Sequence, residues 1–180
     1  MRWRPLPALR QEGLLTQVVL GTIHRHFEYS QNVEYSGQID LERGEIEYTR
    51  HCGTTSPFPW GPEVVFHTHP RASCAKDHSY PDLFLFCCSP ARVSLLFSEH
   101  HVSVLEKEAP GLPQFDELRD KLDFLRNGGH LQFSEGSNSL YFSAILERRF
   151  PEVYRVVSFK EKFGLLCKAL RIRQQEWKIP

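Results

Sequence analysis

Two histidines one residue apart, followed by an aspartate, are the side chains of this sequence best suited to hold a metal ion. His67 and His69 end an apolar run that begins at Val64. In a strand, residues i and i+2 point to the same side, so the two imidazoles could grip one ion. Asp82 adds an oxygen ligand. Two imidazoles and one carboxylate, with a fourth position left to water, are the ligand count of a catalytic zinc site. The chemistry expected is hydrolysis, provided that a general base lies nearby.

The residues around the histidine pair strengthen this interpretation, because H-x-H alone is weak evidence in a chain with nine histidines. Pro70 ends the strand, and Ser79-Tyr80-Pro81-Asp82 opens an apolar helical run. Ser79 is the expected N-cap of that helix, with Pro81 and Asp82 in its first turn. A helix start would hold Ser79 and Asp82 on rigid backbone facing the end of the strand.

An upstream hairpin carries the candidate general bases. Val33–Asp40 alternates as a strand does, and a turn leads into a second strand from Glu45 to Tyr48. Glu34 is the favoured base, because it precedes Gly37, where strands could approach closely. Glu47 is the runner-up and remains open. A carboxylate can do general base and acid work once a metal has brought the pKa of a water near 7.

These stretches resemble the motif of the JAMM family, also called MPN+ or JAB metalloproteases. The likeness rests on His67-Thr68-His69-Pro70, on Ser79-x-x-Asp82 and on Glu34-x-x-Gly37-x-Ile39. It implies that His67, His69 and Asp82 bind Zn²⁺. It also implies that Glu34 moves a proton from the bound water to the leaving amine, while Ser79 helps to hold the oxyanion.

The same resemblance implies a substrate and partners. Family members hydrolyse isopeptide or peptide bonds, many of them after the C-terminus of ubiquitin or a ubiquitin-like protein. Small stand-alone relatives belong to bacterial conjugation-like systems, with E1- and E2-like proteins as partners, or to viruses. A deubiquitinase-like protease acting on a ubiquitin-like protein or its conjugate is therefore expected.

One departure from the family pattern concerns the spacer. The family places seven residues between the second histidine and the serine, whereas residues 70–78 make nine here. Two further loop residues are tolerable, because the entropy of loop closure grows slowly with length. Asp77 and His78 lie in this spacer as competing ligands.

Composition bounds the class of protein. The chain has 180 residues with 22 basic and 22 acidic side chains, so no global charge recruits nucleic acid or a membrane surface. Because Met1–Pro5 has no apolar stretch, we expect no signal peptide, and the sequence contains no run of 18 apolar residues. The five cysteines contain no C-x-x-C pair, and Cys87 and Cys88 lie in an apolar run. We expect a cytoplasmic protein whose buried cysteines behave as small hydrophobes.

The remaining elements are expected as follows. Apolar spacing predicts a helix over 7–27, with His24 and His26 at the surface, and strands over 93–98 and 102–105 joined by a turn at His100-His101. After a break at 109–113, we expect a helix over 115–125, another from Ser137 or Ser139 to Arg149, a strand over 153–159, and a helix over 160–175. That last helix has a basic face, which is either solvated or a docking surface.

The element order predicts an α+β fold, with helices around a mixed sheet. We expect one domain over 1–180, with a core at about 7–106 and a C-terminal extension at 107–180. The family resemblance implies a JAB/MPN-like fold, the three-layer type also seen in cytidine deaminases. Two other hypotheses remain open: a metal-free MPN-type scaffold that only binds partners, and a zinc hydrolase acting on a different amide or on nucleic acid.

Overall fold

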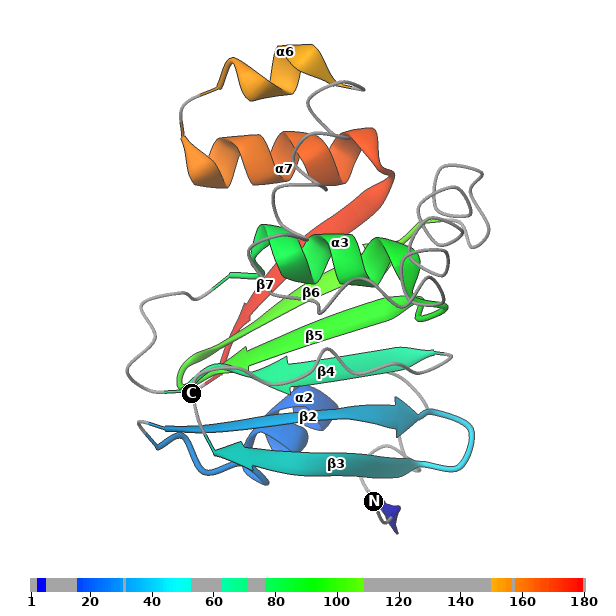
Figure 1. Ribbon diagram of the computed structural model, residues 1–180. Helices are drawn as coiled ribbons and strands as arrows, with labels where there is room; N and C mark the ends of the chain where they lie inside the picture. Colours follow the sequence, from blue (N-terminus) through cyan, green and yellow to red (C-terminus); the bar gives the residue numbers. More distant parts are fainter. Residues whose placement is uncertain are drawn as a thin grey trace, which may run out of the picture. The chain divides into compact units, whose positions relative to one another are not determined.

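The computed structural model describes residues 3–5, 16–30, 32–52, 63–70, 77–108, 150–156 and 158–179. Within them, seven strands form one mixed sheet in the order β1-β3-β2-β4-β5-β6-β7 (Figure 1). The strands are β1 (Arg4–Pro5), β2 (Val33–Asp40), β3 (Glu45–Cys52), β4 (Val64–Thr68), β5 (Val93–Ser98), β6 (His101–Lys107) and β7 (Ile172–Lys178). The described helices are α2 (Gln17–His24), α3 (Tyr80–Cys88), α6 (Pro151–Tyr154) and α7 (Phe159–Ala169). The predicted α+β class is confirmed.

The chain forms two compact units. The first contains Met1–His78, Pro90–Leu105 and Gln175–Pro180, and the second contains Ser79–Ser89 and Glu106–Gln174. A single JAB-like domain with its core at about 7–106 stays a prediction.

The predicted hairpin is confirmed in the first unit. Strands β2 and β3 are antiparallel, with a register that runs from Val33↔Cys52 to Asp40↔Glu45. The chain reverses through Gly44, whose φ of 64° suits glycine. At Gly37 a Cβ atom would lie 2.0 Å from the carbonyl oxygen of Glu47, so the two strands approach as closely as the sequence suggested.

Strand β4 pairs with β2 antiparallel and with β5 parallel. Because side chains alternate along each strand, these ladders sort the residues onto two faces. One face is apolar and packs with α2, which lies across the strands in Figure 1. Its buried residues include Tyr35, Ile39, Phe66, Leu95 and Phe97. We call it the apolar face, and the opposite face of β2, β3 and β4 the polar face.

Helix α2 begins after Thr16, whose side chain accepts a hydrogen bond from the Val19 amide. Its apolar stripe, with Ile23 fully buried, faces the core as predicted. Phe27, just past the helix, has its ring centroid 5.2 Å from that of Phe66. The predicted helix began at residue 7, and residues 6–15 lie outside the described part of the chain.

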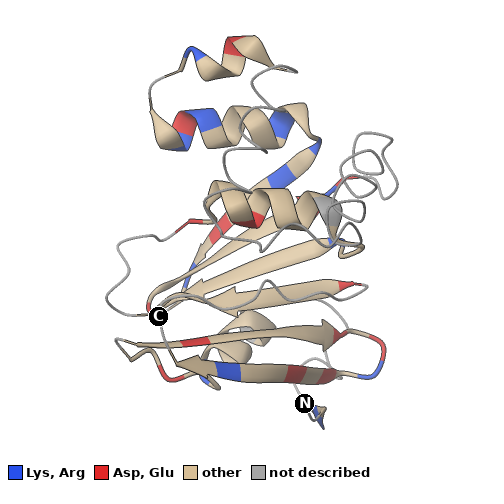
Figure 2. Cartoon of the chain, viewed as in Figure 1, with Lys and Arg blue, Asp and Glu red and all other residues tan. Residues whose placement is uncertain are grey.

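The second unit contains α3, α6 and α7. Four side chains on one face of α7 and just past its end are buried: Phe163, Leu166, Cys167 and Leu170. Their spacing is that of one face of a helix, which explains why they share the buried side. The ring of Tyr80 at the start of α3 lies 4.9 Å from Phe159. The charged side chains of α7 carry both signs (Figure 2), and no docking role follows from them.

Two C-terminal predictions are wrong. The expected strand over 153–159 is instead the short helix α6 followed by the start of α7, because Pro151 occupies a helical first turn and Ser158 caps α7. The expected helix over 160–175 ends at Ala169, and β7 follows. Arg171 turns the chain with φ 53°, a conformation usually left to glycine. The helices expected over 115–125 and up to Arg149 lie outside the described residues.

Three cysteines are described with their side chains. Cys87 and Cys167 are buried, and burial raises the pKa of the Cys167 thiol to about 12. Cys87 is the small buried hydrophobe that was expected, whereas Cys52 is exposed. No helix in the described part of the chain has the length and apolar character needed to span a bilayer.

Candidate metal centre

His67, His69 and Asp82 form a group that could hold a metal ion. Each offers one ligand atom, and these atoms all lie within 4.8 Å of one another. The ring centroids of the two histidines are 5.3 Å apart. His67 is buried, and the other two are half-buried. Two imidazole nitrogens with one carboxylate oxygen suit zinc and other first-row transition metals, and the donor set alone does not choose among them.

The strand ladders position the two histidines. His67 lies in β4 opposite Ser36 of β2 and Leu96 of β5. His69 follows the last residue of β4, and its amide donates to the carbonyl of Phe97 at 2.9 Å, so the chain continues beside β5. The apolar strand therefore ends at the histidine pair, as predicted.

Ser79 and Asp82 form a capping box at the start of α3. The amide and the hydroxyl of Ser79 both donate to Oδ2 of Asp82 at 2.7 Å, and the Asp82 amide donates to Oγ of Ser79 at 3.3 Å. This confirms the predicted N-cap. A carboxylate has about four lone-pair sites, so Asp82 can cap the helix and ligate an ion together. The hydroxyl proton of Ser79 is directed to Asp82, and its oxyanion role stays a prediction.

The polar face places Glu34 at the same end of the sheet as the histidine pair. Ser36 lies opposite His67 in the last pair of the β2–β4 ladder, and Glu34 is two residues beyond Ser36, at the end where His69 follows β4. Glu34 and Ser36 share one face because they are two residues apart. Glu34 is also 5% exposed, so its carboxylate is held within the protein.

Glu47, the alternative base, lies farther from the ligands. It pairs with Gln38 and accepts a hydrogen bond from the Gln38 side chain at 2.8 Å. Counted from His67, which lies opposite Ser36, Glu47 is two strands across and two residues along, or about 10 Å and about 7 Å. Glu34 is one strand across and two residues along, or about 5 Å and about 7 Å. The register therefore favours Glu34 over Glu47.

His51 is a member of the polar face that the sequence did not reveal. The second strand of the hairpin is expected to end at Tyr48, but β3 continues through Cys52. His51 lies opposite Glu34, and its Nε2 is hydrogen-bonded to Oγ of Ser36 at 2.8 Å. The alternation that puts Glu47 on this face, continued by four residues, would have found it.

His78, one of two competing ligands in the spacer, is part of a buried polar cluster. It is fully buried, with Nδ1 3.1 Å from Oγ of Ser103 and Nε2 3.3 Å from Oγ of Ser94. Its ring centroid lies 5.9 Å from that of His67. Both ring nitrogens face serine hydroxyls, which hold the imidazole of His78 beside that of His67. The possible metal group includes neither His78 nor Asp77.

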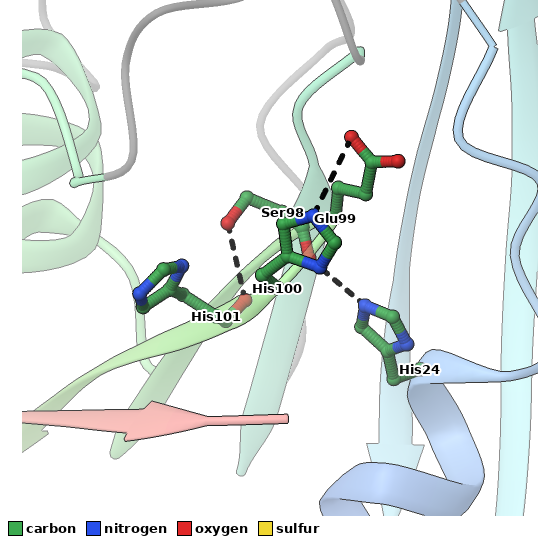
Figure 3. A network of polar contacts seen from close by, with 5 residues as sticks. All are labelled: His24, Ser98, Glu99, His100 and His101. Carbon is green, nitrogen blue, oxygen red and sulfur yellow. Dashed lines mark hydrogen bonds and ion pairs between the residues drawn. The ribbon is translucent and has the colours of Figure 1, made fainter. Parts of the chain in front are cut away.

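The other paired histidines lie at the β5–β6 turn (Figure 3). His100 is in the turn, as predicted, whereas His101 begins β6. The expectation of a surface position is right for His26 but wrong for His24, which is half-buried and donates from Nε2 to the Ser98 carbonyl at 2.9 Å. Burial lowers the pKa of His24, against the opposing effect of its backbone hydrogen bonds.

Comparisons with known proteins add no relative. No protein-family model, no curated protein and no solved structure matches the chain. The likeness to the JAMM family therefore rests on the motif residues alone.

Proposed function

We propose that this protein is a zinc-dependent hydrolase of the JAMM type. The observation that supports this most is the convergence of His67, His69 and Asp82, whose ligand atoms lie within 4.8 Å of one another. A second observation is the β2–β4 register, which pairs Ser36 with His67 and so puts the buried Glu34, two residues farther along β2, at the same end of the sheet as the histidine pair. A metal group with a buried carboxylate beside it is the arrangement that metal-assisted hydrolysis needs.

Each residue has a defined task in this proposal. His67, His69 and Asp82 would hold the ion, which when bound would acidify a water and polarise the carbonyl under attack. Glu34 takes a proton from the attacking water and delivers it to the leaving amine. Ser79 holds Asp82 through two hydrogen bonds, and its hydroxyl could turn to the developing oxyanion once Asp82 is held by the ion.

The substrate class follows from the family likeness. The bond cleaved would be the isopeptide or peptide bond after the C-terminal tail of a ubiquitin-like protein. E1- and E2-like proteins of the same conjugation system would be partners, and the cytoplasm would be the location. A different amide substrate would use the same ligands.

Metal content and cleavage, measured together on four proteins, test the proposal. These are the wild type, His67→Ala, Glu34→Gln and Glu47→Gln, each dialysed against zinc and assayed on a panel of ubiquitin-like fusions. The wild type should bind one zinc per chain and cleave at least one fusion. His67→Ala should lose both zinc and cleavage. Glu34→Gln should keep zinc and lose about 10²–10⁴-fold in kcat, the usual contribution of a general base.

Glu47→Gln is the matched control, because Glu47 is also a nearly buried carboxylate on the polar face. It should cleave at the wild-type rate. A large loss in Glu47→Gln with none in Glu34→Gln would move the base to β3. Wild-type protein that binds no zinc would favour the metal-free scaffold, and zinc binding without cleavage of any fusion would point to another amide.

A further inference from the structure

Neighbouring strands place polar side chains side by side on the polar face. His51 of β3 lies opposite Glu34 of β2, and His69 follows β4 at the same end of the sheet. The next row holds Thr49, Ser36 and His67 in the same strand order. Glu34 therefore has His51 directly opposite on β3, while the proposed metal ligand His67 lies opposite its neighbour Ser36 on the β4 side.

The hydrogen bond of His51 crosses from one row to the other. Directly opposite residues of antiparallel strands have Cβ atoms about 5 Å apart, and Ser36 is about 7 Å farther along β2 than Glu34. Because Nε2 of His51 lies 2.8 Å from Oγ of Ser36, the imidazole must lean diagonally toward β2. It then occupies the β3 side of Glu34.

Because Glu34 is buried, the position of the His51 imidazole limits the conformations open to the Glu34 side chain. With 5% of its surface exposed, the Glu34 side chain cannot extend into solvent. His51, directly opposite on β3, restricts the directions toward that strand, and the histidine pair lies on the other side, toward β4. An ordered carboxylate is what proton transfer requires, since a misplacement of about 1 Å can lower a rate by about 10²-fold.

We infer that His51, held by Ser36, is a positioning residue that directs the Glu34 carboxylate toward the metal site. The inference rests on the proposed hydrolase function. His51 itself touches neither the ion nor the substrate and acts through Glu34. Ser36 has the lesser part, because it holds His51 rather than Glu34.

Steady-state kinetics on the zinc-loaded protein provide the first test. His51→Ala should lower kcat about tenfold with KM unchanged, since only the orientation of the base is lost. Ser36→Ala should lower kcat by a smaller factor, and His51→Gln, which retains a hydrogen-bonding group, should keep most of the activity. Thr49→Ala is the matched control, because Thr49 lies on the same face of β3 opposite Ser36. It should leave kcat unchanged.

A double variant tests whether His51 acts through Glu34. In a Glu34→Gln background, His51→Ala should cause no further loss, because the group that it positions is already absent. Zinc affinity, measured by competition with a chromophoric chelator, should stay within about twofold of the wild type in every variant except those of the ligands. Thermal unfolding identifies any variant that does not fold, and Ser36→Ala then takes the place of His51→Ala.

NMR gives a readout that needs no activity. In protein labelled with ¹³C-glutamate, the two γ-protons of Glu34, assigned with Glu34→Gln, should have distinct shifts in the wild type and Thr49→Ala. They should average in His51→Ala. If the wild type cleaves nothing, the proposed function fails and this spectrum alone decides the inference. The inference would be overturned by any of three results. The first is a wild-type kcat in His51→Ala, the second is that His51→Ala lowers kcat as much in the Glu34→Gln background as in the wild type, and the third is distinct Glu34 γ-proton shifts in His51→Ala.

Discussion

The apolar face and the polar face of the β2–β4 region are built from alternate residues of the same strands, yet they do different work. Phe66 and His67 are neighbours in β4 and both are buried, but Phe66 packs in the core with α2 while His67 joins the metal group. On β2, Tyr35 likewise packs in the core and the adjacent Glu34 lies on the polar face, opposite His51. The comparison teaches that one set of ladders both stabilises the fold and aligns the site.

The largest expected effect is a loss of stability on the apolar face that the adjacent residue on the polar face does not share. Phe66→Ala should lower the free energy of unfolding by about 3–5 kcal/mol, because it leaves a cavity in the aromatic cluster around Phe27. His67→Ala should lower that of the metal-free protein by about 1 kcal/mol, yet abolish zinc binding. Urea unfolding and zinc titration of both variants measure the difference. Equal losses of stability would mean that the faces are not separate.

A smaller effect is expected where β2 and β3 touch. Gly37→Ala should lower the free energy of unfolding by about 1–3 kcal/mol, because the added Cβ meets the Glu47 carbonyl oxygen at 2.0 Å, and backbone must shift. Gln38 follows Gly37 and lies on the polar face. Gln38→Ala should change the free energy of unfolding by about 1 kcal/mol or less, because the hydrogen bond to Glu47 is lost. Urea unfolding compares the two. A tolerated Gly37→Ala would show that the strands can separate.

The contribution of the α3 cap to the proposed zinc binding of Asp82 can be measured with a matched pair of serines. Ser79→Ala should destabilise the protein by about 1 kcal/mol and weaken zinc binding about tenfold, because Asp82 loses a hydrogen bond that orients it. Ser158 caps α7 through the Glu161 amide, so Ser158→Ala should weaken only stability. Urea unfolding and chelator competition give the two numbers. Equal zinc affinities in the two variants would contradict an orienting role for Ser79.

The smallest expected effect comes from His24, a polar group beside the apolar face. Burial lowers its pKa below the ordinary 6.5, so the unfolded chain takes up a proton at a higher pH than the folded one. The free energy of unfolding should therefore be constant above pH 6.5 and fall as the pH drops below it. His24→Gln should reduce this slope in urea unfolding from pH 7.5 to 5. An unchanged slope would assign the effect to other groups.

Helix starts and strands could be predicted from the sequence wherever a short pattern of residues specifies them. Ser79 with Asp82 predicted the helix start, and the alternation from Val33 to Asp40 predicted β2, because caps and period-2 patterns are properties of short segments. The end of α7 could not be read, because Arg171 adopts the left-handed conformation without the glycine that usually signals it. Strand β7 likewise depends on pairing within the sheet rather than on its own residues.

The candidate site was only partly readable. His67, His69 and Asp82 were predicted from residue types and spacing, and the structure brings the three together. The choice between Glu34 and Glu47 depended on the register of β2 against its neighbours, which no local pattern encodes. His51 was missed for the same reason, since its relation to Glu34 exists only once the strands pair.

The antiparallel ladder between β2 and β4 also determines which changes of chain length such a site can survive. Residues added between the two strands would lengthen the chain from Glu34 to His67, but they would leave the pairing of β2 with β4 intact. A single deletion within β2, by contrast, would exchange its odd and even positions and turn the carboxylate toward the aromatic core. Distant proteins with this arrangement are thus better recognised by which alternate positions of each strand carry the site residues than by the number of residues between them.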